Sequence, residues 1–213
     1  GAERVFGLHT AYDLEAGTVG LKPGINNAAV DHFRIRVHGK STHVSTPHLG
    51  VDALYIASQI VVAVQGLVTR RTSPTEPVII GIGKLNAGTT YNAVAEHAVM
   101  EGTTRTVSQE SRDRIRRLVT ETADSIAAIY GGTAEIVWTD FAAALINDAE
   151  VCREAAAVAD SLLGEGHVVT DRELSLSGDN FAEFELYRPG AYAYLGTGNP
   201  DMCESDDLGV RYQ

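Results

Sequence analysis

Residues 31–140 alternate between stretches with the periodicity of strands and stretches with the periodicity of helices. Strand patterns cover 31–37, 77–85, 97–105 and 134–138, and helical patterns cover 52–68 and a second stretch that ends at Tyr130. The resulting order is strand, helix, strand, strand, helix, strand. This order predicts a ferredoxin-like fold, in which two helices cover one face of a four-stranded sheet.

Local residues refine this prediction. Ser108 is the expected N-cap of the second helix, with Ser111 as the alternative, because a serine hydroxyl accepts a hydrogen bond from a first-turn N–H. The run Val78–Ile82 is almost continuously apolar, which is typical of a strand buried on both faces. The arginines within 112–117 lie among acidic residues at helical spacing, which favours a solvated helix face.

The segments on either side of this module predict one α/β layer that the module interrupts. Strand patterns cover 4–9 and 191–195, a helical pattern covers 148–163, and Gly178-Asp179-Asn180-Phe181 is expected to open a short helix. We therefore expect a ferredoxin-like domain over 29–140, inserted into an α/β domain made of 1–28 and 141–213. Cys152 falls in the apolar pattern of its helix and is expected in the core.

Composition excludes several classes of protein. Seventeen basic and 28 acidic residues give a formal charge of −11, which disfavours a nucleic-acid partner. No run reaches the roughly 18 apolar residues of a membrane helix, and the longest candidate, 53–68, contains three polar residues, so no membrane association is expected. Two cysteines are too few for a disulfide framework, which favours a cytoplasmic location.

Four residues are candidates for chemistry. His43 lies in a Gly-containing loop between a strand and a helix, where a histidine can face a ligand. His9 ends the first strand pattern, with a buried structural histidine as the alternative. Asn92 either contacts a ligand or serves a turn, and Arg105 either anchors a substrate or forms a salt bridge within its strand. The other strand histidines, His32, His38 and His97, are expected at the surface, and His48 is expected to be structural.

Six motifs occur in an order that resembles the M20 metallopeptidase family, in its amidohydrolase branch. They are Phe6–His9, Gly39–His48 with Gly50–Asp52, Gly88–Asn92, Glu101–Thr106, Asn147–Asp148 and Gly178–Phe181. The resemblance implies a catalytic α/β domain that binds two divalent metal ions, zinc, manganese or cobalt. It also implies that a ferredoxin-like lid interrupts this domain and mediates homodimerisation, and open sheet edges suit such pairing.

The resemblance also implies roles for the four candidates. His9 matches a metal ligand, and His43 matches the lid histidine that polarises the scissile carbonyl, often across the dimer. Asn92 and Arg105 match lid residues near the carboxylate end of the substrate. These residue types suit amide hydrolysis, because a metal activates water, a histidine donates to the oxyanion, and an arginine binds a carboxylate with paired donors.

The chain departs from the family pattern at several positions. It has no Cys-x-His pair before His9, no Glu-Glu pair, and no histidine after His167. The usual Gly-Glu-Asp-Phe motif reads Gly178-Asp179-Asn180-Phe181. One ligand cannot hold a dinuclear site, and the missing glutamate would be the general base. We therefore expect a form that lacks the N-terminal part of the enzyme, with an incomplete metal site and no activity of its own.

The expected function of the parent protein is hydrolysis of the amide bond of N-acyl amino acids or small peptide-like conjugates. One alternative is a non-catalytic dimerisation or carboxylate-binding module that uses Asn92 and Arg105 without metal. Another is a dipeptidase or carboxypeptidase of the same family. Cys203 and the acidic residues around it offer a further cation site, although a solvated tail is the expected reading.

Overall fold

The computed structural model describes residues 1–198, which form two compact units. The first, here called the lid unit, consists of Asn27–Ala144 and Leu176–Asn180. The second, the flanking unit, consists of Gly1–Asn26, Leu145–Ser175 and, among the described residues, 181–198. The sequence-based boundaries, 28/29 and 140/141, lie close to these, but nothing in the sequence assigned 176–180 to the lid.

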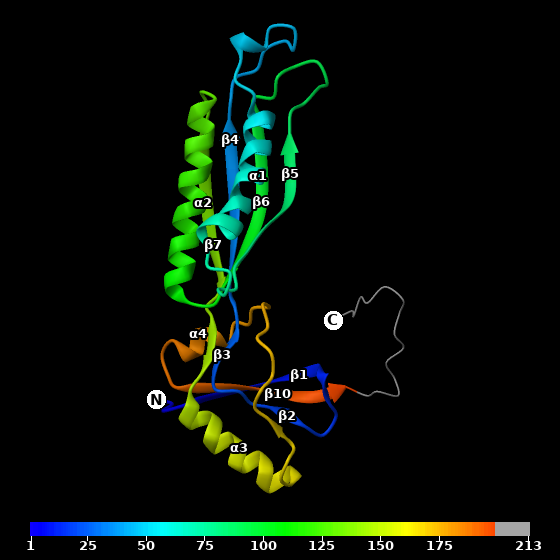
Figure 1. The fold of residues 1–213 in the computed structure, drawn as a ribbon, viewed down its shortest axis with the longest axis vertical. Helices are drawn as coiled ribbons and strands as arrows, with labels where there is room; N and C mark the ends of the chain where they lie inside the picture. The colour runs from blue at the N-terminus through cyan, green and yellow to red at the C-terminus, as the bar shows by residue number, and fades with distance from the viewer. Residues whose placement is uncertain (199–213) are drawn as a thin grey trace. The chain divides into compact units, whose positions relative to one another are not determined.

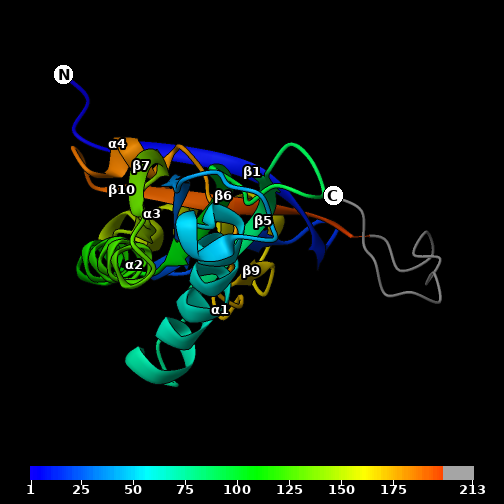
Figure 2. The same ribbon diagram turned by 90° about the horizontal axis from the view of Figure 1, so that it is seen from above.

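The lid unit is one antiparallel sheet with two helices. Its strands are β4 (Ala29–His38), β5 (Ile79–Ala87), β6 (His97–Thr106) and β7 (Thr133–Ala142), in the spatial order β5-β6-β4-β7. The helices α1 (Ala53–Arg71) and α2 (Gln109–Ile129) lie side by side on one face of the sheet (Figure 1 and Figure 2). The predicted element order of the ferredoxin-like fold is confirmed.

The core of the lid unit lies between the sheet and the helices. Phe33, Ile35 and Val37 alternate along β4 and are fully buried, while the residues between them point to the face without helices, here called the open face. Ile56 and Ile60 of α1 and Ile115 and Val119 of α2 complete this cluster. Burying each large apolar side chain contributes about 1.5–3 kcal/mol, so this cluster accounts for much of the stability of the unit.

Side-chain caps define where the helices begin. The Asp52 carboxylate accepts hydrogen bonds from the N–H groups of Leu54 and Tyr55 at 2.9 and 3.1 Å, at the start of α1. The Ser108 hydroxyl accepts from the N–H of Ser111 at 3.1 Å, which confirms Ser108 as the N-cap of α2. These local signals were readable in the sequence because each cap lies within three residues of its partner.

Two expectations for the lid unit are wrong. The apolar run Val78–Ile82 belongs to an edge strand, and Ile79 is 42% exposed, because β5 has a neighbour on one side only and helices on one face only. Arg112 does not lie on a solvated face: it is 6% exposed and pairs with the buried Asp31 of β4. The charge pattern along α2 cannot reveal a partner 81 positions earlier.

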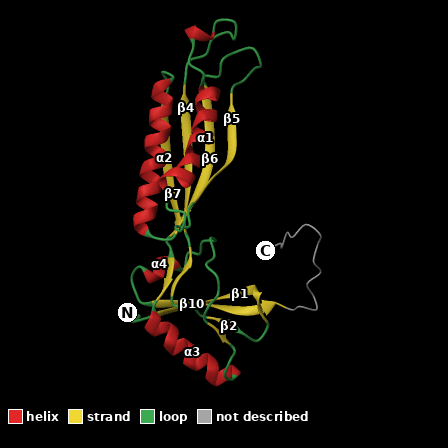
Figure 3. Cartoon of the chain, viewed as in Figure 1, coloured by secondary structure: helices red, strands yellow, loops and turns green. Residues whose placement is uncertain are grey.

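The flanking unit contains a four-stranded sheet and a helix. The sheet has the order β1-β10-β2-β9, formed by Val5–Glu15, Gly190–Gly198, Val19–Gly20 and Val168–Val169. Figure 3 labels the first three of these strands. Strands β1 and β10 run parallel, and α3 (Ala149–Leu163) packs its buried Cys152 against Ala191 and Ala193 of β10. Cys152 is therefore a core residue, as expected.

The remaining elements show where sequence patterns were too weak to read. Strand β1 continues six residues beyond His9, and the short strands β2, β3 (Gly24–Asn27) and β9 were not predicted. Strand β3 pairs with β8 (Leu145–Asn147). The short helix α4 covers Ala182–Glu185, and the preceding Gly178 lies so close to Val30 that a side chain there would overlap it.

Candidate functional site

His43 lies in the loop between β4 and α1, with its imidazole exposed. Its Nδ1 accepts a hydrogen bond from the N–H of Ser45 at 3.2 Å and lies 2.7 Å from the Ser45 hydroxyl. Because Nδ1 acts as the acceptor, the neutral ring carries its proton on Nε2. His43 can therefore donate a hydrogen bond outward from Nε2, which is what polarising a carbonyl requires.

Asn92 lies beside this loop. The N–H of Val44 donates to the carbonyl of Asn92 at 3.2 Å, and His43 pairs with Ala93 in an isolated bridge. The Asn92 side chain is half-buried, and its Oδ1 accepts from the Thr90 hydroxyl at 3.2 Å. The turn before it requires Gly88, whose φ of +70° suits glycine. The structure thus brings His43 and Asn92 together at one end of the lid unit.

Arg105 lies on β6, on the open face of the sheet, and is half-buried. Within residues 1–198, its guanidinium has no hydrogen bond or ion pair. The alternative that Arg105 forms a salt bridge within its strand is therefore wrong for the described residues. Strand β6 begins at His97, next to the loops of His43 and Asn92, and Arg105 follows eight residues later. At about 3.3 Å per residue, this separation is roughly 26 Å. Arg105 therefore does not join the other two lid residues within one chain.

His9 lies in the middle of β1, opposite Tyr194, and not at a strand end as expected. It is exposed, which excludes a buried structural histidine. Its Nδ1 lies 2.7 Å from the carbonyl oxygen of Thr10. Because a carbonyl only accepts, Nδ1 carries the proton and the lone pair of Nε2 is left open. Metal-ligating histidines commonly have this arrangement, with one ring N–H donated to a backbone carbonyl.

The described residues do not provide the ligands of a dinuclear metal site. Across residues 1–198, no three His, Cys, Asp or Glu side chains cluster in a way that would hold a metal ion. The nearest aromatic neighbours of His9, Tyr192 and Tyr194, have ring centroids 6.2 and 6.4 Å from its ring. Cys203 and the acidic residues that follow it lie outside the described residues. His9 is thus a single available donor.

Sequence reasoning identified the candidate residues but missed the groups that orient them. The Ser45 N–H and the Thr10 carbonyl determine which ring nitrogen of His43 and His9 faces outward. For His43 the donor is the backbone N–H of Ser45, a group that almost every residue type supplies. For His9 the partner is a backbone atom, which no sequence pattern marks.

The comparisons with known proteins agree on one family. Residues 29–131 match the model of the M20 peptidase dimerisation domain. The chain is 35% identical over 197 residues to N-acetyl-L-cysteine deacetylase of Bacillus subtilis, covering 92% of this chain and 47% of that protein. It is 32% identical to thermostable carboxypeptidase 1 of Saccharolobus solfataricus, covering 93% of this chain and 50% of that protein.

A solved structure agrees with these relatives. A Bacillus subtilis dinuclear metal-binding peptidase of the M20 family superposes with a TM-score of 0.76 at 31% identity, covering 92% of this chain and 49% of that one. The chain thus spans about half the length of the curated relatives it matches. Residues 29–131 are an M20 peptidase dimerisation domain. The chain is a homologue of the M20 deacetylases and carboxypeptidases over about half of their length.

Proposed function

We propose that this chain is the dimerisation domain and part of the catalytic domain of a metal-dependent amidohydrolase that cleaves N-acyl amino acids. The names of its relatives, N-acetyl-L-cysteine deacetylase and carboxypeptidase, both denote cleavage of an amide bond in a substrate with a free amino-acid carboxylate. In this proposal His43 donates to the developing oxyanion, Asn92 contacts the substrate, and Arg105 binds the carboxylate. His9 contributes one ligand to a metal site whose other ligands come from outside this chain.

The observation that carries the proposal is the separation of His43 and Asn92 from Arg105. An N-acyl amino acid has only a few bonds between its acyl carbonyl and its carboxylate. The roughly 26 Å along β6 therefore prevents His43 and Arg105 of one chain from holding the same molecule. Two copies remove this conflict, since His43 of one copy can meet the substrate that Arg105 of the other copy binds.

The lid unit has a surface suited to such pairing. Strand β5 is a sheet edge with free backbone groups, and α1 packs beside it. From Ala53 to Thr69, α1 carries no charged residue, although Tyr55 is 48% and Val62 is 71% exposed. Among the described helices, only α1 also has the length and composition of a membrane span, and one third of that window is buried in the lid core. A second copy packed on α1 and β5 would cover this surface.

An alternative is favoured by the described residues, 1–198, which hold no cluster of metal ligands. The chain by itself would then act as a dimerisation or carboxylate-binding module, with Arg105, which has no ion pair within 1–198, as its anchor. A dipeptidase or carboxypeptidase activity differs from the first proposal only in the acyl group. In either enzymatic case, we propose that the 213-residue chain alone is inactive.

The test compares two proteins. The chain alone is equilibrated with zinc or manganese, and its metal content and its hydrolysis of N-acetyl amino acids are measured. The second protein is the chain extended by the part of the Bacillus subtilis deacetylase that this chain does not match. We expect fewer than two metals and no turnover for the chain alone, and about two metals with turnover for the extended protein. The extended protein could instead bind metal and carboxylates but show no turnover. That result would favour the non-catalytic module.

A substitution then tests His43. In the active extended protein, His43→Ala is expected to lower kcat by at least about 100-fold, as for loss of an oxyanion donor, while metal content stays unchanged. The matched control is His48→Ala in the same loop, which should retain turnover. Normal turnover of His43→Ala would contradict the assigned role.

A further inference from the structure

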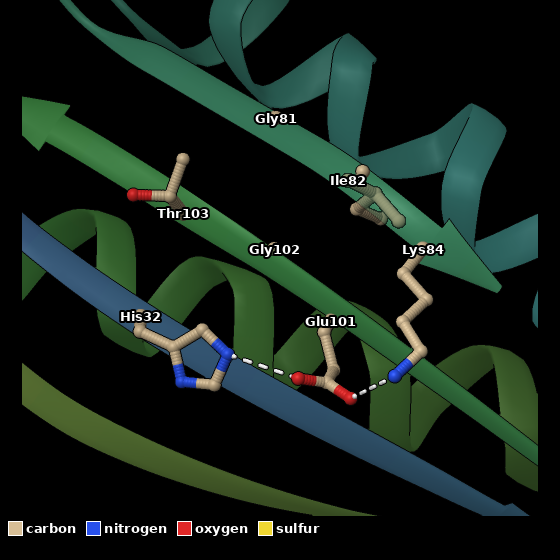
Figure 4. A pocket seen from close by; sticks show the side chains of 8 residues that line it. His32, Gly81, Ile82, Lys84, Glu101, Gly102 and Thr103 are labelled. Carbon is tan, nitrogen blue, oxygen red and sulfur yellow. Dashed lines mark hydrogen bonds and ion pairs between the residues drawn. The ribbon is translucent and has the colours of Figure 1, made fainter.

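The open face of the lid sheet contains a hollow of about 470 Å³ over β5 and β6 (Figure 4). Its lining consists of His32, Gly81, Ile82, Gly83, Lys84, Glu101, Gly102 and Thr103. The hollow exists because β5 lacks side chains where it would otherwise be filled. A Cβ on Gly83 would meet no heavy atom within 4 Å, and one on Gly81 would only reach Thr103, at 4.0 Å. Most of the surface that lines the hollow is apolar.

One wall of the hollow is charged. The Glu101 carboxylate accepts a hydrogen bond from Lys84 Nζ at 3.1 Å and lies 3.4 Å from His32 Nε2 (Figure 4). Arg34, which does not line the hollow, has its Nη2 3.5 Å from the same carboxylate. One carboxylate thus faces two permanent cations and one titratable imidazole. The chain as a whole has a charge of −11, whereas the charged groups around Glu101 are mostly positive.

The cations retain binding capacity. Side chains of Lys84 and His32 are 60% and 45% exposed, and Lys84 has further N–H donors beyond the one used by Glu101. Arg34 does not line the hollow, and its buried Nε is not one of the donors available to a ligand there. Glu101 fixes the positions of these groups without neutralising them. An additional anion is what the remaining donors would bind.

We propose that this hollow binds a small amphipathic monocarboxylate. Its carboxylate accepts hydrogen bonds from Lys84 and His32, and its apolar body lies over Gly81 and Gly83. A phosphate or a dicarboxylate fits less well, because the second negative charge of such a ligand would be repelled by Glu101. The lining also offers little polar surface beyond the charged wall. The site lies within the lid unit and does not depend on the proposed hydrolase activity.

Hexanoate is a suitable probe, with the neutral hexanamide and the short acetate as controls. Hexanoate is titrated into the ¹⁵N-labelled 213-residue chain, and backbone amide shifts are followed by NMR. We expect saturable shifts confined to 81–84 and 101–103, with acetate and hexanamide each binding at least about tenfold more weakly, since each lacks one of the two contacts. Equal binding of hexanamide, equal binding of acetate, or no saturation would overturn the proposal.

Variants identify the site. Lys84→Gln removes one positive charge from the wall and should weaken binding about tenfold, the effect of one charge-assisted hydrogen bond. The matched control, Arg36→Gln, removes one positive charge from an exposed residue of the same sheet face outside the hollow, and should leave binding unchanged. Gly83→Leu fills the hollow and should abolish binding, with Gly81→Ala as a milder second variant; thermal unfolding confirms that each variant is folded. Equal weakening by Arg36→Gln would show a general charge effect and refute the site.

Discussion

At the scale of single residues, Asp31 is the most consequential buried charge of the lid unit. Its carboxylate, 1% exposed, accepts hydrogen bonds from Arg112 Nε at 3.0 Å and Nη2 at 2.6 Å, and from Arg116 Nε at 3.0 Å. Arg116 also pairs with Asp140 at the far end of β7. Burial raises the pKa of Asp31, but the hydrogen bonds and charges of both arginines outweigh it, so the pKa lies below its ordinary value.

Replacing Asp31 by asparagine should destabilise the fold strongly. Asp31→Asn keeps the shape but leaves the buried Arg112 guanidinium with only the exposed Asp140, 3.8 Å away, as a counter-charge, and loss of a buried partner typically costs about 3–5 kcal/mol. The free energy of unfolding from urea titration measures this loss. Asp140→Asn is the control, because that carboxylate is 67% exposed and its removal should cost no more than about 1 kcal/mol. Similar losses for both variants would contradict the central role of Asp31.

The same carboxylate predicts a pH dependence. Since its folded-state pKa is below that of the unfolded chain, about 3.9, ionised Asp31 stabilises the fold above that pH. This contribution is lost as the pH falls through the lower folded-state pKa. We therefore expect the difference in unfolding free energy between the wild type and Asp31→Asn to be constant from pH 7 to 5. It should shrink below about pH 4, and a difference independent of pH would exclude this assignment.

Asp31 also illustrates what the sequence could not reveal at this scale. Strand alternation placed it correctly on β4, and helical spacing placed Arg112 correctly on α2. Their pairing depends on how α2 lies across the sheet, which is a tertiary property. A charged residue was therefore assigned to a solvated face when its partner lay 81 positions away. The prediction that His9 ends its strand was wrong for a different reason. Strand β1 continues through Thr10 and Tyr12, and no turn residue marks an end near His9.

At the scale of elements, local signals were readable, whereas the position of a strand in its sheet was not. The caps at Asp52, Ser108 and Asp148 follow from side-chain bonds that close within three residues. The apolar run of β5 gave the correct element type but the wrong place in the sheet. Whether a strand is central or at an edge depends on its neighbours, and an apolar edge strand with glycines has the same composition as a buried one.

The cap of α1 offers a test at this scale. Asp52→Ala removes the acceptor for the N–H groups of Leu54 and Tyr55, and should lower the free energy of unfolding by about 1 kcal/mol. The control is Ser58→Ala, which lies inside the same helix and loses only a hydroxyl bond to the Tyr55 carbonyl. Because alanine favours helices, that variant should stay within about 0.5 kcal/mol of the wild type. A neutral Asp52→Ala would show that packing alone defines the start of α1.

At the scale of the whole molecule, the candidate site is divided between distant positions. The candidate residues His43, Asn92 and Arg105 each lie in a recognisable local pattern, and the roles assigned to them remain predictions. Their separation depends on which end of β6 lies beside the loop of His43, a tertiary property that no motif reveals. In the proposed function, this division would require that the residues acting on one substrate come from two copies, so that the proposed dimer would be needed for catalysis.

The exposed face of α1 therefore provides the decisive test of assembly. Val62→Glu places a charge at the centre of this uncharged face, where dimerisation would bury it without a partner, and should weaken self-association at least about 100-fold. Since Val62 is 71% exposed, the fold of each chain should survive. Ile129→Glu, at the 74% exposed end of α2, is the matched control and should remain dimeric. Light scattering coupled to size exclusion distinguishes the two, and a dimeric Val62→Glu with a monomeric Ile129→Glu would move the interface to α2.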